Sequence, residues 1–144
     1  MSTFRTTSQV FDVDKSGENH LLVGSDDFEI RTFRNEDVVN QVTEVDKVTF
    51  LKRTNGRNFA YGLANGSIGV YNSPATRAWR VKTKHSVTAL ASYDIDGDGV
   101  REIVSGWSNG MFNVRREENG EVVFKEPAPP SMGTLYDSFM KKIF

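Results

Sequence analysis

The sequence predicts an all-β chain, a partial β-propeller of about three four-stranded antiparallel blades with a short C-terminal helix or disordered tail. The first observation is an internal repeat. Residues 11–24 (FDVDKSGENHLLVG) return as 93–106 (YDIDGDGVREIVSG), and 61–68 (YGLANGSI) align with 105–112 (SGWSNGMF), which gives a unit of about 40 residues. The second is alternation of apolar residues over short runs, interrupted by turn residues, as in consecutive antiparallel strands.

Each unit provides four strands, and the three blades account for residues 1–126. The first blade, at about 8–43, is expected to contain strands at 8–13, 20–24, 28–34 and 38–43. The second, at about 47–83, is expected to contain strands at 47–53, 58–63, 67–72 and 77–83. The third, at about 87–126, is expected to contain strands at 87–95, 101–107, 111–116 and 121–125. Asn-Gly pairs at 55–56, 65–66, 109–110 and 119–120 mark tight turns that accept positive φ.

Glycine positions favour blades over a β-sandwich. Gly24, Gly62 and Gly106 occupy equivalent places near the ends of the second strands, where a missing Cβ allows a bend or a close backbone approach. The first strand of the third unit begins Val-Thr-Ala-Leu-Ala at 87–91, and such small residues suit a strand crowded near a central axis.

Two surface interpretations follow from alternation in the outer strands. Arg80, Lys82 and Lys84 share one strand face, which is expected to meet water while Trp79 packs inward; a basic docking patch is the alternative. Trp107 either lies buried between blades or is exposed for contact, and burial is favoured.

The segment 94–102 (DIDGDGVRE) carries the chemically most specific pattern. Asp94, Asp96, Asp98 and Glu102 place carboxylates around a glycine turn, a ligand set that suits a hard cation such as calcium. The flanking residues read as strands, so the loop resembles the calcium loops of integrin-type propellers, not an EF-hand. The alternative is that the aspartates accept hydrogen bonds from backbone amides of their own loop and stiffen the turn.

The related segment 12–20 in the first unit lacks the third aspartate and carries Lys15. We therefore expect this loop not to hold a metal.

Composition limits the function classes. The formal net charge is -1, so no overall field attracts nucleic acid, and no apolar run is long enough to insert into a membrane. The N-terminal residues lack a signal-peptide core, and the absence of cysteine suits the cytoplasm. No nucleophile elbow accompanies the two histidines, so the chain is expected not to be an enzyme and to need no cofactor other than, in the alternative, calcium.

Five ordered blocks resemble one protein family. They are 24–31 (GSDDFEIR), 63–71 (LANGSIGVY), 79–82 (WRVK), 106–110 (GWSNG) and 120–125 (GEVVFK). Over roughly residues 8–126 the chain is similar to the central blades of the N-terminal propeller in the family of the second Bardet-Biedl syndrome protein, a BBSome subunit. The resemblance implies a non-catalytic interaction scaffold in ciliary membrane-protein trafficking, with other BBSome subunits as partners and the cilium or basal body as location.

The resemblance ends before the C-terminal segment. Residues 127–133 are expected to form a Pro-rich linker, and 134–144 an amphipathic tail with Leu135, Phe139 and Ile143 on one side. Three blades cannot close a ring, so a homodimer that forms six blades, or a tail folded over an open face, is expected. The rival functions are a calcium-binding, adhesion-type propeller module, which would centre on the aspartate loop, and an enzyme with its site in the ring mouth.

Overall fold

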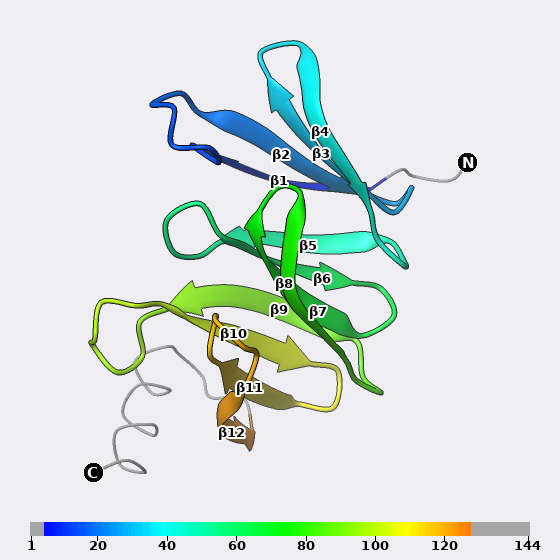
Figure 1. Ribbon diagram of the computed structural model, residues 1–144. Helices are drawn as coiled ribbons and strands as arrows, with labels where there is room; N and C mark the ends of the chain where they lie inside the picture. Colours follow the sequence, from blue (N-terminus) through cyan, green and yellow to red (C-terminus); the bar gives the residue numbers. More distant parts are fainter. Residues whose placement is uncertain (1–4, 128–144) are drawn as a thin grey trace.

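A computed structural model describes residues 5–127 of the chain, and within this range the backbone forms twelve strands (Figure 1). The strands are β1 Thr6–Phe11, β2 His20–Ser25, β3 Glu29–Arg34, β4 Asp37–Thr43, β5 Val48–Arg53, β6 Phe59–Leu63, β7 Ser67–Ser73, β8 Thr76–Lys82, β9 Val87–Tyr93, β10 Glu102–Trp107, β11 Met111–Arg115 and β12 Val122–Pro127. Each strand expected from the sequence is present, with ends that differ by at most two residues.

The described strands form three separate antiparallel sheets, each in simple chain order. We call them blade 1 (β1–β4), blade 2 (β5–β8) and blade 3 (β9–β12). In Figure 1 the blades follow one another, and β1 contacts β5 while β5 contacts β9. The first strands therefore line one side of the array, as predicted for strands near a propeller axis. Among the described residues there is no helix of the length and hydropathy needed to cross a bilayer.

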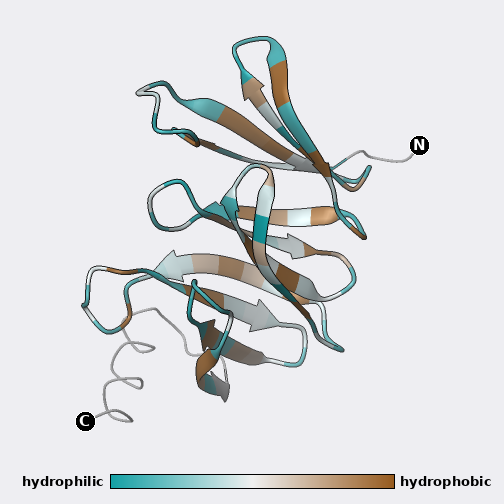
Figure 2. Ribbon diagram, viewed as in Figure 1, coloured by the Kyte–Doolittle hydropathy of each residue, from teal (hydrophilic) through white to brown (hydrophobic). Residues whose placement is uncertain are grey.

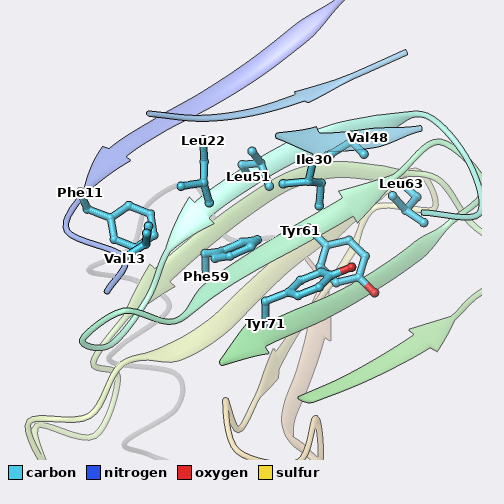
Figure 3. Close-up of a cluster of buried hydrophobic side chains, with 10 residues drawn as sticks. All are labelled: Phe11, Val13, Leu22, Ile30, Val48, Leu51, Phe59, Tyr61, Leu63 and Tyr71. Atoms are coloured by element: carbon cyan, nitrogen blue, oxygen red, sulfur yellow. The ribbon is translucent and has the colours of Figure 1, made fainter. Parts of the chain in front are cut away.

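The largest apolar core lies between blades 1 and 2 (Figure 3). The ring of Phe59 stacks on Tyr71 at a centroid distance of 5.1 Å and meets the edge of Phe11 at 6.4 Å. The remaining members of this cluster come from both blades and are Val13, Leu22, Ile30, Val48, Leu51, Tyr61 and Leu63. Neither blade could bury this surface alone, so the packing of neighbours supplies the stability of each.

The contact between blades 2 and 3 combines a smaller apolar cluster with hydrogen bonds between polar side chains. Ala60, Val70 and Ile103 are buried together. Next to them the carboxylate of Glu117 accepts hydrogen bonds from the side chains of Asn55 and Asn58, each at 2.6 Å.

Trp79 takes part in the same contact, because its Nε1 donates to the Glu117 carbonyl at 2.5 Å. The inward packing expected for Trp79 is confirmed, and Lys82 and Lys84 on the opposite face are exposed. The side chain of Arg80 on that face is only partly in water, because its guanidinium lies 3.4 Å from the buried carboxylate of Glu44. The burial of Trp107, which is 5% exposed, is also confirmed.

The repeated glycine positions are equivalent in the structure. Gly24, Gly62 and Gly106 are each the next-to-last residue of the second strand of a blade. At Gly24 a Cβ would lie 2.4 Å from Cγ1 of Val48, the first residue of blade 2. Glycine there allows the backbone of blade 1 to approach its neighbour.

Two strands end earlier than the alternation predicted. β1 stops at Phe11 and β9 at Tyr93, because the carboxylates of Asp12 and Asp94 capture backbone amides and turn the chain into a loop. Val13 and Ile95, expected at strand ends, are instead buried loop residues.

The last strand, β12, ends with Pro127, which was expected to begin the linker. The rest of that linker and the amphipathic tail at 134–144 lie outside the described residues.

The two terminal blades differ in their outward apolar faces. On blade 1, direct cross-strand pairs join Val10 to Leu21, Leu21 to Phe33, and Phe33 to Val38. We call these four residues the blade 1 row; Val10 is 64% exposed and Val38 is 49% exposed.

The outward face of blade 3 is the face turned away from blade 2. It carries an apolar cluster that is buried in the structure; the members are Ile95, Val104, Phe112, Val114 and Phe124. Figure 2 shows hydrophobic segments along the strands of blade 1 and mostly hydrophilic connecting turns. The prediction of an open apolar face is therefore confirmed for blade 1 only.

Candidate functional site

The loop between β9 and β10 brings the four predicted carboxylates together. Asp94, Asp96 and Asp98 lie on the loop, and Glu102 is the first residue of β10. The ligand oxygens that these four residues offer all lie within 4.8 Å of one another. A sequence pattern spread over nine positions thus becomes a single carboxylate group, which we call the blade 3 loop site.

Backbone amides hold this loop in a tight curl. Asp94 accepts the amide of Gly97 on Oδ1 at 2.9 Å and that of Gly99 on Oδ2 at 2.8 Å. Gly97 and Gly99 have φ values of 75° and 87°, a region that favours glycine. Asp98 Oδ1 likewise accepts the amide of Val100 at 2.9 Å. The turn stiffening considered as the alternative therefore occurs, and it leaves the carboxylates converging.

The electrostatics of the group are unfavourable without a cation. Burial, together with the nearby carboxylate of Asp96, raises the pKa of Glu102 to about 7. Burial also raises the pKa of Asp96. For Asp94 burial acts in the same direction, but amide donors led by Gly99 outweigh it and lower the pKa. None of the four carboxylates forms an ion pair with a lysine or arginine among residues 5–127.

The arrangement can hold a hard divalent cation. All four side chains offer oxygen, the donor type that calcium prefers, and calcium accepts oxygen ligands in a variable coordination geometry. Asp98 and Glu102 also line an open pocket of about 330 Å³, so the group is accessible to solvent. The two helices that flank the loop of an EF-hand are not needed for oxygen ligands to coordinate a cation.

A buried polar cluster between blades 1 and 2 was not found by sequence reasoning. The side chain of Glu44 is fully buried, accepts a hydrogen bond from the Tyr71 hydroxyl, and lies 3.4 Å from Nη1 of Arg80 and 3.7 Å from Nη1 of Arg77. Burial and then Glu44 raise the pKa of Tyr71 above its ordinary range and that of Tyr61 to about 12. Figure 3 shows the two tyrosine hydroxyls directed to the same region.

Glu44 stands in the connection between two predicted strands, where an acid is ordinarily solvated, so no local signal marks it. The cluster ties the connection to blade 2 and has a structural role.

Comparison with solved structures identifies the fold to which the three blades belong. The crystal structure of BBS1N in complex with ARL6DN aligns with a TM-score of 0.68 at 19% identity, covering 85% of this chain and 36% of that chain. The computationally designed Ika4 protein aligns with a TM-score of 0.68 at 15% identity, covering 87% of this chain and 73% of the designed one. At such identities the likeness concerns the fold. The three blades are part of a β-propeller.

Sequence relatives are more specific. The family described as ciliary BBSome complex subunit 2, middle region, matches residues 7–115. BBSome complex member BBS2 of Homo sapiens is 43% identical over 115 residues, which are 80% of this chain and 16% of that protein. BBSome complex member bbs-2 of Caenorhabditis elegans is 36% identical over 121 residues, 84% of this chain and 16% of that protein.

The chain belongs to the family of ciliary BBSome complex subunit 2 and matches its middle region. It spans 16% of the length of these curated relatives. The resemblance predicted from the ordered sequence blocks is confirmed.

Proposed function

We propose that this chain is a non-catalytic protein-protein interaction scaffold that acts within the BBSome in ciliary membrane-protein trafficking. Its partners are other BBSome subunits, and it works in the cytoplasm and at the cilium or basal body. Family membership and the propeller fold support this role. The catalytic alternative has no comparable support, because the strongest cluster of perturbed acids is the blade 3 loop site, whose ligand set suits a cation.

The observation that carries the proposal is the blade 1 row. Leu21 and Phe33 form a direct cross-strand pair on the outward face of blade 1, as Phe59 and Tyr71 do on the corresponding face of blade 2. Phe59 and Tyr71 are 0% and 3% exposed because blade 1 covers them, whereas Leu21 is 39% exposed. The repeat therefore presents, at blade 1, the same kind of face that it buries elsewhere, and exposed apolar patches of this kind mark interaction sites.

Replacing Leu21 with aspartate is expected to reduce the recovery of BBSome subunits with the chain by at least about tenfold, since a carboxylate would have to be desolvated in the contact. The measurement is affinity capture of the tagged chain from ciliated cells, with known BBSome subunits detected individually. Val45→Asp is the matched control, because Val45 is 54% exposed and lies outside the row. Equal recovery with both variants would remove the row from the interface, and failure of the unmodified chain to recover any BBSome subunit would contradict the scaffold role.

We also propose that, without other subunits, the isolated chain forms a homodimer in which two blade 1 rows face each other. A six-bladed ring would need an exposed apolar face at both ends, but the outward cluster of blade 3 is buried. A two-fold contact needs only one self-complementary patch. Sedimentation of the Leu21→Asp and Val45→Asp variants at micromolar concentration tests this: the first should be monomeric and the second dimeric. A monomeric unmodified chain would rule the dimer out.

A second proposal concerns the blade 3 loop site, and the specific observation is the convergence of four carboxylates that form no ion pair with a lysine or arginine within residues 5–127. We propose that Asp94, Asp96, Asp98 and Glu102 bind calcium and hold the β9–β10 loop in place. A calcium-binding, adhesion-type module is the functional alternative that this site would serve. Calcium then acts on stability, since a ligand that binds only the folded state raises the melting temperature.

Calcium is expected to raise the melting temperature of the unmodified chain by several degrees at neutral pH and by less at pH 5, where protons compete for the carboxylates. Glu102→Gln is expected to weaken calcium affinity by about tenfold or more, because calcium affinity depends on ligand charge. Glu18→Gln is the matched control, since Glu18 lies in the related loop of blade 1 and pairs with Arg34. Calorimetry showing no calcium binding at millimolar concentration would contradict the proposal.

A further inference from the structure

The loop between β1 and β2 repeats the backbone arrangement of the blade 3 loop site. Asp12 Oδ2 accepts the amide of Gly17 at 2.7 Å, as Asp94 accepts that of Gly99 at 2.8 Å. Asp12 Oδ1 accepts the amide of Ser16 at 3.1 Å. The sequence predicted no metal here, because Ser16 replaces the third aspartate and Lys15 lies within the loop. The same curl of the chain is nevertheless present.

The residue that closes this loop is different in kind. His20 is the first residue of β2 and pairs with Phe11, as Glu102 is the first residue of β10 and pairs with Tyr93. Ligand atoms of Asp12, Asp14 and His20 all lie within 4.8 Å of one another, and His20 Nε2 is 3.6 Å from Asp14 Oδ2. An imidazole nitrogen therefore stands where blade 3 has a carboxylate.

The surroundings of His20 supply an independent observation. His20 is 2% exposed, and its Nδ1 has no hydrogen-bond partner among the described residues. Thr32, on the neighbouring strand β3, is 1% exposed, and its Oγ1 is likewise unpaired within residues 5–127. Both residues line a pocket of about 270 Å³ between blade 1 and the β7–β8 turn, and Asp14 lies in the same lining. Buried polar atoms are nearly always hydrogen-bonded, so Nδ1 of His20 and Oγ1 of Thr32 are two groups that a molecule in this pocket could bind.

Lys15 does not neutralise the loop. It is exposed, its φ is 61°, and it forms no ion pair with Asp12 or Asp14 in the part of the chain that the structure describes. The two aspartates thus remain available to a cation.

We propose that Asp12, Asp14 and His20 bind a divalent transition metal of the zinc class, with water completing the coordination. Imidazole with two carboxylates suits zinc, whereas an all-oxygen set suits calcium. A water in the adjoining pocket can join Nδ1 of His20 to Thr32 Oγ1, the kind of outer contact that orients a metal-binding histidine. The two related loops thereby select different metals through two positions: His20 stands in place of Glu102, and Ser16 stands in place of Asp98.

The test is isothermal titration of the full chain, purified without a histidine tag, with zinc chloride in calcium-free buffer, and a parallel titration with cobalt followed by visible absorption. We expect one zinc site that His20→Gln and Asp14→Asn each weaken by about tenfold or more, while Glu102→Gln leaves its affinity unchanged. Asp14→Asn covers the case in which the buried His20 variant fails to fold, because half of the Asp14 side chain is exposed.

Three outcomes would overturn the proposal. They are no zinc binding at micromolar concentration, zinc binding that survives Asp14→Asn, and zinc binding that Glu102→Gln abolishes. The calcium proposal for blade 3 is tested separately, so it can fail while the zinc site stands, and the reverse.

Discussion

Replacing Phe59 with alanine is expected to lower the free energy of unfolding by about 4 kcal/mol, which is a large part of the stability of a small domain. Phe59 is 0% exposed and lies at the centre of the core between blades 1 and 2. Its ring contacts Phe11 on blade 1 and Tyr71 on blade 2, so truncation opens a cavity that neither rigid sheet can fill.

Urea denaturation followed by tryptophan fluorescence measures this change. Val45→Ala is the control, because Val45 is 54% exposed and its truncation is expected to cost less than about 0.5 kcal/mol. A loss for Phe59→Ala as small as that of the control would mean that the two blades do not share a core, and the stacked arrangement would be wrong.

The repeat in the sequence was sufficient to predict the strands and the blades. Turn residues such as the Asn-Gly pairs act locally, and alternation within a strand depends on its own sheet, so both signals survive without knowledge of the neighbours. The second strands of the three blades could be aligned in the sequence because each contains an equivalent glycine, at Gly24, Gly62 and Gly106. These features depend on short stretches of chain, which explains why sequence reasoning reached them.

Contacts between blades could not be predicted from such local patterns. Glu117 meets Asn55 across 62 positions, and Glu44 meets Arg80 across 36 positions. No local pattern marks such partners, because each is an ordinary surface residue within its own strand or turn. Whether the outward cluster on blade 3 is buried could not be decided for the same reason, since periodicity shows that a face is apolar but not whether it is covered.

One of the two aspartate loops could be predicted as a candidate site from the sequence, and the other could not. The blade 3 loop site was predicted with all four carboxylates, since they lie within nine positions of one another. In blade 1 the missing aspartate and Lys15 argued against a metal. The structure adds that His20 reaches the same point as Glu102, a fact that depends on strand pairing and on the pocket beside Thr32.

Gly69→Ala is expected to destabilise the chain by about 3 kcal/mol, through overpacking at a site that cannot relax. Gly69 lies within β7, and an added Cβ would be 2.4 Å from the carbonyl oxygen of Trp79 and 2.6 Å from the ring of Tyr61. The first contact is with backbone of the paired strand β8. The second is with a ring that is itself 0% exposed, so neither neighbour can move aside.

Gly106→Ala is the matched control, because Gly106 is also a strand glycine without positive φ. There the nearest atom to an added Cβ is Thr88 Oγ1 at 3.3 Å, and Thr88 is exposed, so its side chain can turn away. The control is expected to change the free energy of unfolding by less than about 1 kcal/mol, and a gain is allowed, since alanine restricts the unfolded chain more than glycine does. Equal urea midpoints for the two variants would contradict the close approach of β7 to β8, and with it the packing of Tyr61 beneath Gly69.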